Sequence, residues 1–149
     1  MSINKPEKET QKLDKFANKS KSKPLQFQHH LHKAVFKKNK LPSYFIFYPT
    51  SRCNLMCSHC FYHDSLNKKM NELNLDEINA FTKTMDPLLS LILTGGEPYL
   101  RHDLDQIVRI FYENTKIPMV TIPSNGWYLE KMLKQIRNFM NWCPNLILN

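Results

Sequence analysis

The sequence predicts an α/β fold with a parallel sheet, built from three strand–helix units and the start of a fourth strand. Short, continuous apolar segments alternate with amphipathic segments of about a dozen residues, a pattern typical of parallel strands joined by helical crossovers. The only three glycines, Gly95, Gly96 and Gly126, each follow the end of a predicted strand. Because the loops after parallel strands open on one side, ligands are expected at this edge.

The first strand–helix unit begins with Tyr44–Tyr48, an unbroken apolar and aromatic run that Pro49 ends. We expect a strand buried on both faces. Asn74 then opens a helix, because Glu77 stands three positions later as in a capping box. Four residues keep one face of this helix apolar before Pro87 marks its end: Leu75, Ile78, Phe81 and Met85.

The later units repeat this order. A second strand is expected at 88–93, and a third at 117–122. Asp103 is predicted to cap the helix between them, with Gln106 at the third helical position. A further helix at 128–141 is followed by the start of a fourth strand at 146–148.

Charge divides the 149 residues into a Lys-rich tail, 1–40, and a folded part, 41–149. The tail holds eleven lysines against three acidic residues, whereas the remainder is balanced, so the net charge of +8 belongs to the tail. A disordered arm, with a short helix within 25–38, is favoured over an arm that binds nucleic acid or an anionic membrane. His29, His30 and His32 are interpreted as surface residues. Without a signal sequence or membrane span, a cytoplasmic protein is expected.

Three cysteines lie within eight residues after the first strand, at Cys53, Cys57 and Cys60. Such a cluster in an intracellular protein is more typical of metal binding than of disulfides. A four-iron cluster held by three cysteines leaves one iron open for a ligand. Zinc would need a fourth donor, recruited from His59, His63, His29, His30 or Cys143. A third alternative is three cysteines buried as small apolar side chains.

The spacing Cys-x3-Cys-x2-Cys resembles the signature of radical S-adenosylmethionine (radical SAM) enzymes. Two further segments resemble signatures of the same family and follow in its order: Thr94-Gly95-Gly96-Glu97-Pro98 and Pro123-Ser124-Asn125-Gly126. The resemblance covers about residues 44–149. It implies the partial parallel (βα) barrel of that family.

The resemblance also implies a cofactor chemistry. The three cysteines would ligate a 4Fe-4S cluster, and the amino and carboxylate groups of S-adenosylmethionine would occupy the fourth iron. One electron from the cluster would cleave the cofactor to methionine and a 5′-deoxyadenosyl radical, which abstracts hydrogen from a substrate. No catalytic residue beyond the cluster ligands is assigned.

By the family's pattern, the remaining site residues bind the cofactor. The segment Gly95–Pro98 would contact it, with Gly95, Gly96 and Glu97 receiving its ammonium group. His59 would lie near adenine, and Ser124 and Asn125 would face ribose or carboxylate.

Family members have more strand–helix units than this chain. We therefore expect the chain to be the N-terminal part of a longer enzyme, or to be completed by a partner chain. An electron donor and a small-molecule or peptide substrate are expected partners, with peptide modification or cofactor biosynthesis as reaction classes. The alternatives are a non-catalytic iron-sulfur module and a zinc-binding interaction protein.

Some residues near these segments have a structural interpretation. Arg101 is expected to pair with Asp103 or Asp105, and Cys143 is expected to pack rather than to ligate. Three aromatic residues could border the site or pack: Phe61, Tyr62 and Tyr99.

Overall fold

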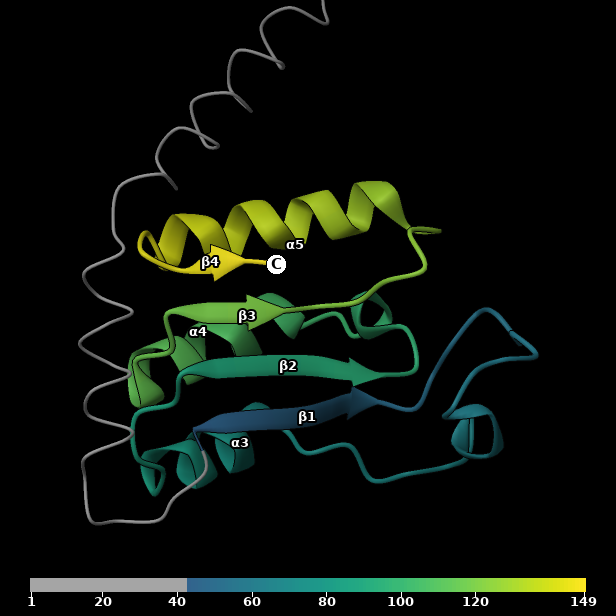
Figure 1. The fold of residues 1–149 in the computed structure, drawn as a ribbon, viewed down its shortest axis with the longest axis horizontal. Helices are drawn as coiled ribbons and strands as arrows, with labels where there is room; N and C mark the ends of the chain where they lie inside the picture. The colour runs from purple at the N-terminus through teal and green to yellow at the C-terminus, as the bar shows by residue number, and fades with distance from the viewer. Residues whose placement is uncertain (1–42) are drawn as a thin grey trace, which may run out of the picture.

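A computed structural model describes residues 43–149, which form one parallel sheet with helices between its strands (Figure 1). The predictions for the Lys-rich tail, the short helix within 25–38, its histidines and the boundary after residue 40 lie outside the described residues. The strands are β1 (Tyr44–Thr50), β2 (Ser90–Gly95), β3 (Met119–Thr121) and β4 (Ile147–Leu148). The α-helices are α3 (Leu75–Lys83), α4 (Leu104–Thr115) and α5 (Leu129–Trp142), and two short 3-10 helices are η2 (His63–Ser65) and η3 (Pro98–Leu100).

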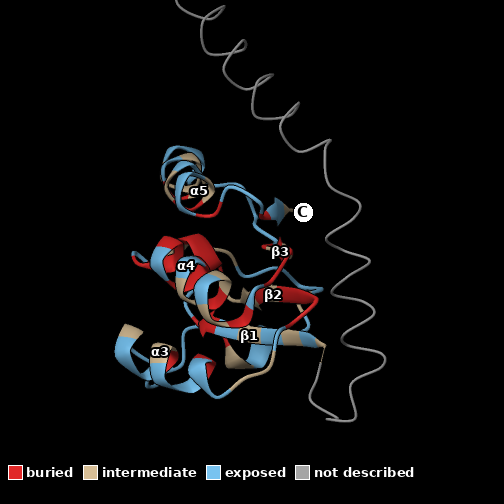
Figure 2. Ribbon diagram, turned by 90° about the vertical axis from the view of Figure 1, so that its left-hand side faces the viewer, coloured by how far each residue is buried: buried red, intermediate tan, exposed pale blue. Residues whose placement is uncertain are grey.

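The strands lie in chain order, β1-β2-β3-β4, and every neighbouring pair is parallel. One helix follows each of the first three strands, and all three helices cover the same face of the sheet (Figure 2). A doubly wound sheet instead reverses its strand order and places helices on both faces. The predicted α/β fold is thus confirmed as the singly wound arrangement of a partial (βα) barrel.

The core lies between the sheet and the helices. The helix-facing positions of the strands are in register, since Phe45 pairs with Leu91 and Leu91 with Val120. Phe111 of α4 packs against the Phe45 and Phe47 rings, with centroids 5.9 and 5.7 Å apart. The core also includes fully buried side chains from each α-helix: Ile78, Leu104, Ile107, Val108, Phe111 and Phe139.

The prediction that the first strand is buried on both faces is wrong. Its side chains alternate, and Tyr44, Ile46 and Tyr48 are 59, 53 and 43% exposed on the face opposite the helices. This face carries no covering element among residues 43–149. The apolar residues of β1 therefore form two differently packed rows, although the run itself shows no polar alternation.

The capping box predicted at Asn74 is confirmed, and Asp103 occupies the predicted N-cap position of α4 without the side-chain bond. The capping box of α3 forms, because Asn74 Oδ1 accepts from Glu77 N at 2.9 Å and Glu77 Oε2 accepts from Asn74 N at 2.8 Å. Asp103 is the N-cap residue of α4, but its side chain accepts no hydrogen bond from the first turn. Its carboxylate instead accepts from Arg101 Nε at 2.8 Å, a charge-assisted bond that outweighs a neutral backbone donor.

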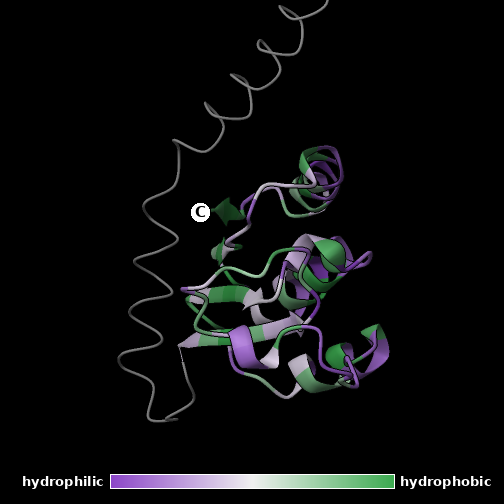
Figure 3. Ribbon diagram, turned by 90° about the vertical axis from the view of Figure 1, so that its right-hand side faces the viewer, coloured by the Kyte–Doolittle hydropathy of each residue, from purple (hydrophilic) through white to green (hydrophobic). Residues whose placement is uncertain are grey.

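The carboxyl ends of β1, β2 and β3 lie along one edge of the sheet, hereafter the carboxyl edge. Figure 3 views the molecule from this edge, where hydrophilic loop stretches flank the hydrophobic strands. Within residues 43–149 there is no helix with both the length and the apolar character needed to cross a bilayer. The carboxyl edge holds the three sequence segments singled out above.

Candidate functional site at the carboxyl edge

The loop after β1, residues 51–67, holds three free cysteines and is hereafter the Cys loop. Cys57 is exposed, while Cys53 and Cys60 are half-buried. Local turns order the middle of the loop, since Cys60 N donates to Cys57 O and His63 N to Cys60 O, both at 3.1 Å. His59 is exposed between them. The loop is therefore a polar, accessible segment, which disagrees with three cysteines buried as small apolar side chains.

The three thiols of the Cys loop do not point at a common metal position in this structure. In the described part of the chain, no group of three or more His, Cys, Asp or Glu side chains is placed to hold a metal ion. The donor set nevertheless fits an iron-sulfur cluster, because it offers three unpaired sulfur ligands on one short loop. Their side chains would have to turn toward a common centre to share a cluster.

Gly95 and Gly96 let the end of β2 approach the backbone of the Cys loop. Gly95 has φ +116°, and a Cβ there would meet Thr50 O at 2.7 Å. A Cβ on Gly96 would collide with the Arg52 backbone. The close approach is held by Gly96 N donating to Thr50 O at 3.0 Å and Glu97 N to Arg52 O at 2.8 Å. Glycine is thus required at both positions for the backbone contact itself, independently of any ligand.

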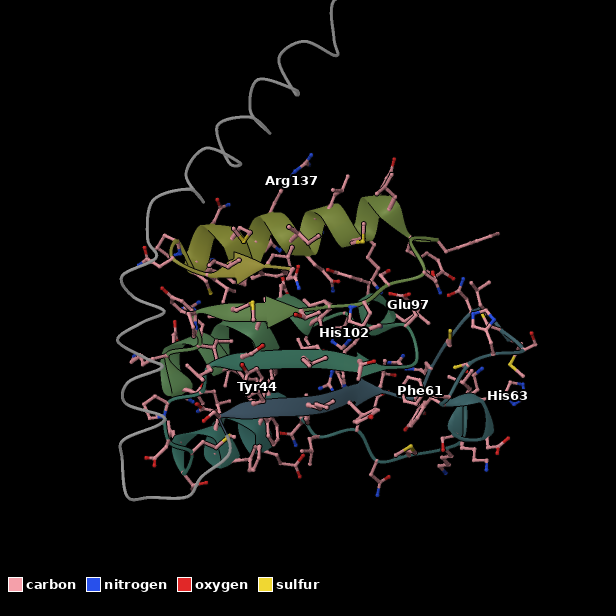
Figure 4. The ribbon with its side chains drawn as sticks, in the orientation of Figure 1. Tyr44, Phe61, His63, Glu97, His102 and Arg137 are labelled. Atoms are coloured by element: carbon pink, nitrogen blue, oxygen red, sulfur yellow. The ribbon has the colours of Figure 1, made fainter. Side chains whose placement is uncertain are left out.

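Glu97 is a buried carboxylate that joins the loops after β2 and β3. It is 2% exposed, and Figure 4 places it at the end of the sheet where Phe61 and His63 also lie. Its Oε1 accepts from Ser124 Oγ at 2.9 Å and from Tyr99 N at 3.2 Å, and its Oε2 accepts from Asn125 N at 2.8 Å. These donors compensate the cost of burying the charge. The segment begun by Gly95 continues into buried Pro98, the first residue of η3.

Asn125 connects the third strand's loop to the Cys loop, and Ser124 connects it to Glu97. Asn125 Nδ2 donates to Asn54 Oδ1 at 3.1 Å and lies 4.0 Å from Cys53 Sγ. Their turn is internally bonded as well, with Gly126 N donating to Ser124 Oγ and Trp127 N to Asn125 Oδ1. The structure therefore brings together Cys53, Glu97, Ser124 and Asn125, whereas His59 has no contact of this kind with them.

Several residues that support this edge were not predicted from the sequence. Asn67 bonds to Ser51 and Cys53 at the base of the Cys loop. Glu72 accepts from Thr50 Oγ1 at 2.5 Å and from Arg52 Nε at 3.1 Å. Asn67 and Glu72 lie 14 or more residues from their partners in the sequence, so no local sequence pattern predicts these contacts. Only their polar character beside the Cys loop could have suggested a role.

Arg101 is structural, as predicted. Buried to 4% exposure, it pairs with Asp103 and donates to Pro49 O at 2.8 Å and Leu73 O at 2.5 Å. Burial alone would raise the pKa of Asp103, but the hydrogen bond and charge of Arg101 lower it below its ordinary value. Arg101 thereby ties the end of β1 and the segment before α3 to the start of α4.

The aromatic residues near the edge differ in their surroundings. Tyr62 stacks on Tyr48, with ring centroids 5.3 Å apart, and Tyr99 is buried in the core. Burial, followed by the Glu97 charge, raises the pKa of Tyr99. Phe61 is 78% exposed on the Cys loop. Tyr62 and Tyr99 therefore pack, and Phe61 is left at the surface of the site.

A model of one protein family matches most of the described part. The family is described as the Radical SAM superfamily, and the match covers residues 47–145. The chain is also 32% identical over 104 residues to the GTP 3′,8-cyclase of Helicobacter pylori (strain ATCC 700392 / 26695), covering 67% of this chain and 32% of that protein. With the GTP 3′,8-cyclase of Listeria welshimeri it shares 35% identity over 92 residues, covering 59% and 28% of the two chains.

The chain thus spans about a third of the length of these curated relatives. Among solved structures, it resembles Streptococcus suis SuiB bound to S-adenosylmethionine. That match has a TM-score of 0.50 and 22% identity, and it covers 99% of this chain and 29% of SuiB. At this identity the likeness supports the fold.

Proposed function

The chain belongs to the radical SAM superfamily, and from that premise we propose that it binds a 4Fe-4S cluster and S-adenosylmethionine to start radical chemistry on a substrate. The observation that carries the proposal is the meeting of three loops at the carboxyl edge. Asn125 of the third loop bonds to Asn54 of the Cys loop, and Glu97 N of the second bonds to Arg52 O. When bound, the cluster would supply one electron for cleavage of a carbon–sulfur bond in S-adenosylmethionine.

In this proposal Cys53, Cys57 and Cys60 hold three irons of the cluster. Thiolates suit this role because soft sulfur ligands favour iron-sulfur clusters over hard cations. His59 is exposed on the same loop and would border adenine. The fourth iron would have no protein ligand and would take the amino and carboxylate groups of S-adenosylmethionine.

The segment Gly95–Pro98 would bind the ammonium end of the cofactor. A carboxylate offers roughly four acceptor sites, and three hydrogen bonds already fix Glu97 from within the protein. Glu97 would therefore meet an ammonium group as a rigid, buried negative charge. Ser124 and Asn125, held by the same carboxylate, would present their polar atoms to ribose or to the cofactor carboxylate.

The proposal includes partners outside the described residues. Reduction of the cluster calls for an external one-electron donor. A small molecule or a peptide is proposed as the substrate, with peptide modification or cofactor biosynthesis as the reaction class and the cytoplasm as the compartment. The relatives named GTP 3′,8-cyclase share only their matched third with this chain, so GTP is not carried over as the substrate.

Anaerobic reconstitution with iron and sulfide tests the proposal. Electron paramagnetic resonance (EPR) spectra of the reduced protein are recorded before and after S-adenosylmethionine is added. Single Cys→Ala variants of Cys53, Cys57 and Cys60 are expected to lose the cluster signal. The matched control is Cys143→Ala, which also removes a thiol but lies buried in the core.

A signal that changes with S-adenosylmethionine, persists in Cys143→Ala and disappears in the other three variants supports the proposal. A cluster whose EPR signal does not change when S-adenosylmethionine is added would instead indicate a non-catalytic iron-sulfur module. Stoichiometric zinc without acid-labile sulfide in the purified protein would indicate a zinc-binding module, and either result would refute the proposed function.

A further inference from the structure

Asn67 closes the Cys loop at its base through three hydrogen bonds. Its backbone N donates to Ser51 O at 2.9 Å. Its side chain makes two more, as Cys53 N donates to Asn67 Oδ1 at 2.9 Å and Asn67 Nδ2 donates to Cys53 O at 3.1 Å. Both polar atoms of the Cys53 backbone are therefore paired with one amide. We call this arrangement the Asn67 clamp.

The clamp explains why asparagine stands at this position. Asn67 has φ +57°, in the left-handed region that asparagine tolerates better than most residues other than glycine. Its amide also offers one acceptor and a donor in one plane, as the Cys53 backbone requires. Glycine would keep the backbone but lose both side-chain bonds, and aspartate would lose the donor. Buried Leu66 anchors the clamp from the preceding position.

Local turn bonds hold the loop from Cys57 onward, whereas the Cys53 backbone bonds to a residue far along the chain. Cys57 and Cys60 are joined by a turn bond between Cys60 N and Cys57 O, and η2 continues that turn. Cys53 lies before these turns, and its backbone bonds reach 14 residues forward to Asn67. The clamp thus sets the first cysteine relative to the other two by fixing both ends of the loop.

The Cys53 sulfur also lies beside N–H donors. Leu55 N donates to Cys53 Sγ at 3.4 Å, and Asn125 Nδ2 lies 4.0 Å from it. Hydrogen bonds to ligand sulfurs are one of the factors that set the reduction potential of an iron-sulfur cluster. Moving the Cys53 backbone would change this environment as well as the position of the ligand.

We propose that Asn67 is a positioning residue. It holds Cys53 in place as the first cluster ligand and keeps the Cys53 sulfur beside the N–H donors of Leu55 and Asn125. The inference rests on the proposed function, because it concerns the same cluster. It adds a residue that touches no iron and acts through Cys53. Its loss is expected to weaken cluster retention and shift the cluster's reduction potential while the fold persists.

Two variants and a control test the inference in the full chain. Asn67→Gly keeps the left-handed backbone and removes the side-chain bonds, and Asn67→Asp keeps the acceptor for Cys53 N but removes the donor. The matched control is Asn114→Ala, which removes an asparagine that donates to Asn79 Oδ1 and Thr82 Oγ1 between α3 and α4. This control reports general destabilisation away from the Cys loop.

The first readout needs no cluster. Hydrogen exchange of the Cys53 amide in the apoprotein is expected to be about fivefold faster in Asn67→Gly than in wild type, because one hydrogen bond is lost. Asn67→Asp and Asn114→Ala are expected to exchange at the wild-type rate at this amide. An equal Cys53 rate in wild type and Asn67→Gly overturns the clamp.

The second readout uses the reconstituted cluster. Loss of its visible absorbance in excess EDTA is expected to be about tenfold faster in Asn67→Gly, the lower size found for partners that orient metal ligands. The rate of absorbance loss in Asn67→Asp is expected to lie between the rates of wild type and Asn67→Gly. The midpoint potential is expected to shift in Asn67→Gly and to stay at the wild-type value in Asn114→Ala.

The outcomes separate the two proposals. A wild-type cluster that responds to S-adenosylmethionine, together with equal EDTA resistance and potential in Asn67→Gly, overturns the positioning role alone. Equally fast cluster loss in Asn67→Gly and Asn114→Ala overturns the positioning role too, since it would come from general destabilisation of the fold. A wild-type chain without a responsive cluster overturns the proposed function and with it the positioning role, whatever the exchange rate at Cys53.

Discussion

Burial makes Cys143 chemically different from the cysteines of the Cys loop. Cys143 is fully buried after α5, and burial, followed by the Glu113 charge, raises the pKa of its thiol to about 12. Cys57 is exposed. Because the thiolate is the reactive form, iodoacetamide at pH 8 is expected to alkylate Cys57 and to leave Cys143 unmodified in the native apoprotein. Mass spectrometry of the digested protein measures both.

Unfolding in urea provides the control for this prediction. All four cysteines are expected to react once the core opens. Native Cys143 reacting as fast as Cys57 would show that the core around α5 is open to solvent, in contradiction to its burial.

The Arg101–Asp103 pair predicts an acid-dependent loss of stability. The pKa of Asp103 is lower in the folded chain than its ordinary value, so the folded state favours the ionised carboxylate. This stabilisation is complete above the unfolded pKa of about 3.9 and disappears as pH falls through the lower folded pKa. Asp103→Asn removes it, so its free energy of unfolding should lie below that of wild type at pH 7.

Urea unfolding from pH 7 to pH 2.5 measures this difference. The gap between wild type and Asp103→Asn is expected to shrink at the acidic end of the series, when Asp103 is protonated in both states. Asp64→Asn is the control, because it removes a carboxylate that is fully exposed instead of buried beside an arginine. A constant gap at every pH would contradict the role assigned to the Asp103 charge.

At the scale of elements, the packing of β2 against the Cys loop depends on Gly96. A Cβ there would collide with the Arg52 backbone, which cannot move aside as a flexible side chain would. Gly96→Ala is therefore expected to lower the free energy of unfolding by about 2 kcal/mol or more, as for overpacked interiors. It should also weaken cluster retention, because the Cys loop begins at this contact.

Gly126→Ala is the matched control for Gly96→Ala. Gly126 has φ +74°, and a Cβ there would meet no atom within 4 Å. Its cost is expected to come from the backbone conformation alone, at about 1 kcal/mol. Urea denaturation measures both variants, and an equal or larger loss in Gly126→Ala would contradict the steric argument for Gly96.

The elements themselves could be predicted because their signals are local. The capping box at Asn74, the apolar periods of the helices and the positions of the glycines all lie within a few residues of what they determine. Asp103 occupies the predicted cap position, but its side chain does not cap the helix because Arg101, two residues away, offers its carboxylate a charged donor. Asn67 was missed because its partner Cys53 lies 14 residues away and the link exists only in the folded loop.

The same limit applies to the site. The cysteine spacing and the Gly95–Pro98 segment could be found as patterns, and the parallel topology explains why they share an edge. Their chain positions do not reveal that Glu97 is buried with three internal donors. Nor do they reveal that Gly95 and Gly96 serve the contact with Thr50 and Arg52, since close backbone approach depends on register between separate strands.

At the scale of the whole molecule, the described sheet has one covered and one open face. Ile46 and Ile147 are 53 and 42% exposed on the open face, where Ile92 pairs with Ile46. Apolar side chains predominate on this face, which also holds Thr121 beside Ile92, and exposed apolar surface of this kind favours association. The chain is therefore expected to self-associate through this face at micromolar concentrations.

The double variant Ile46→Thr/Ile147→Thr tests this expectation, because threonine keeps a β-branched side chain but removes apolar surface. Each replacement is expected to weaken self-association about tenfold, since an isoleucine side chain contributes about 1.5 kcal/mol when buried. Sedimentation velocity across a concentration series measures the change. Leu129→Thr on α5, which alters a residue that is 54% exposed outside the sheet, is the control. If wild type sediments as a monomer throughout, the open face does not drive association; if the control weakens association as much as the double variant, another surface does.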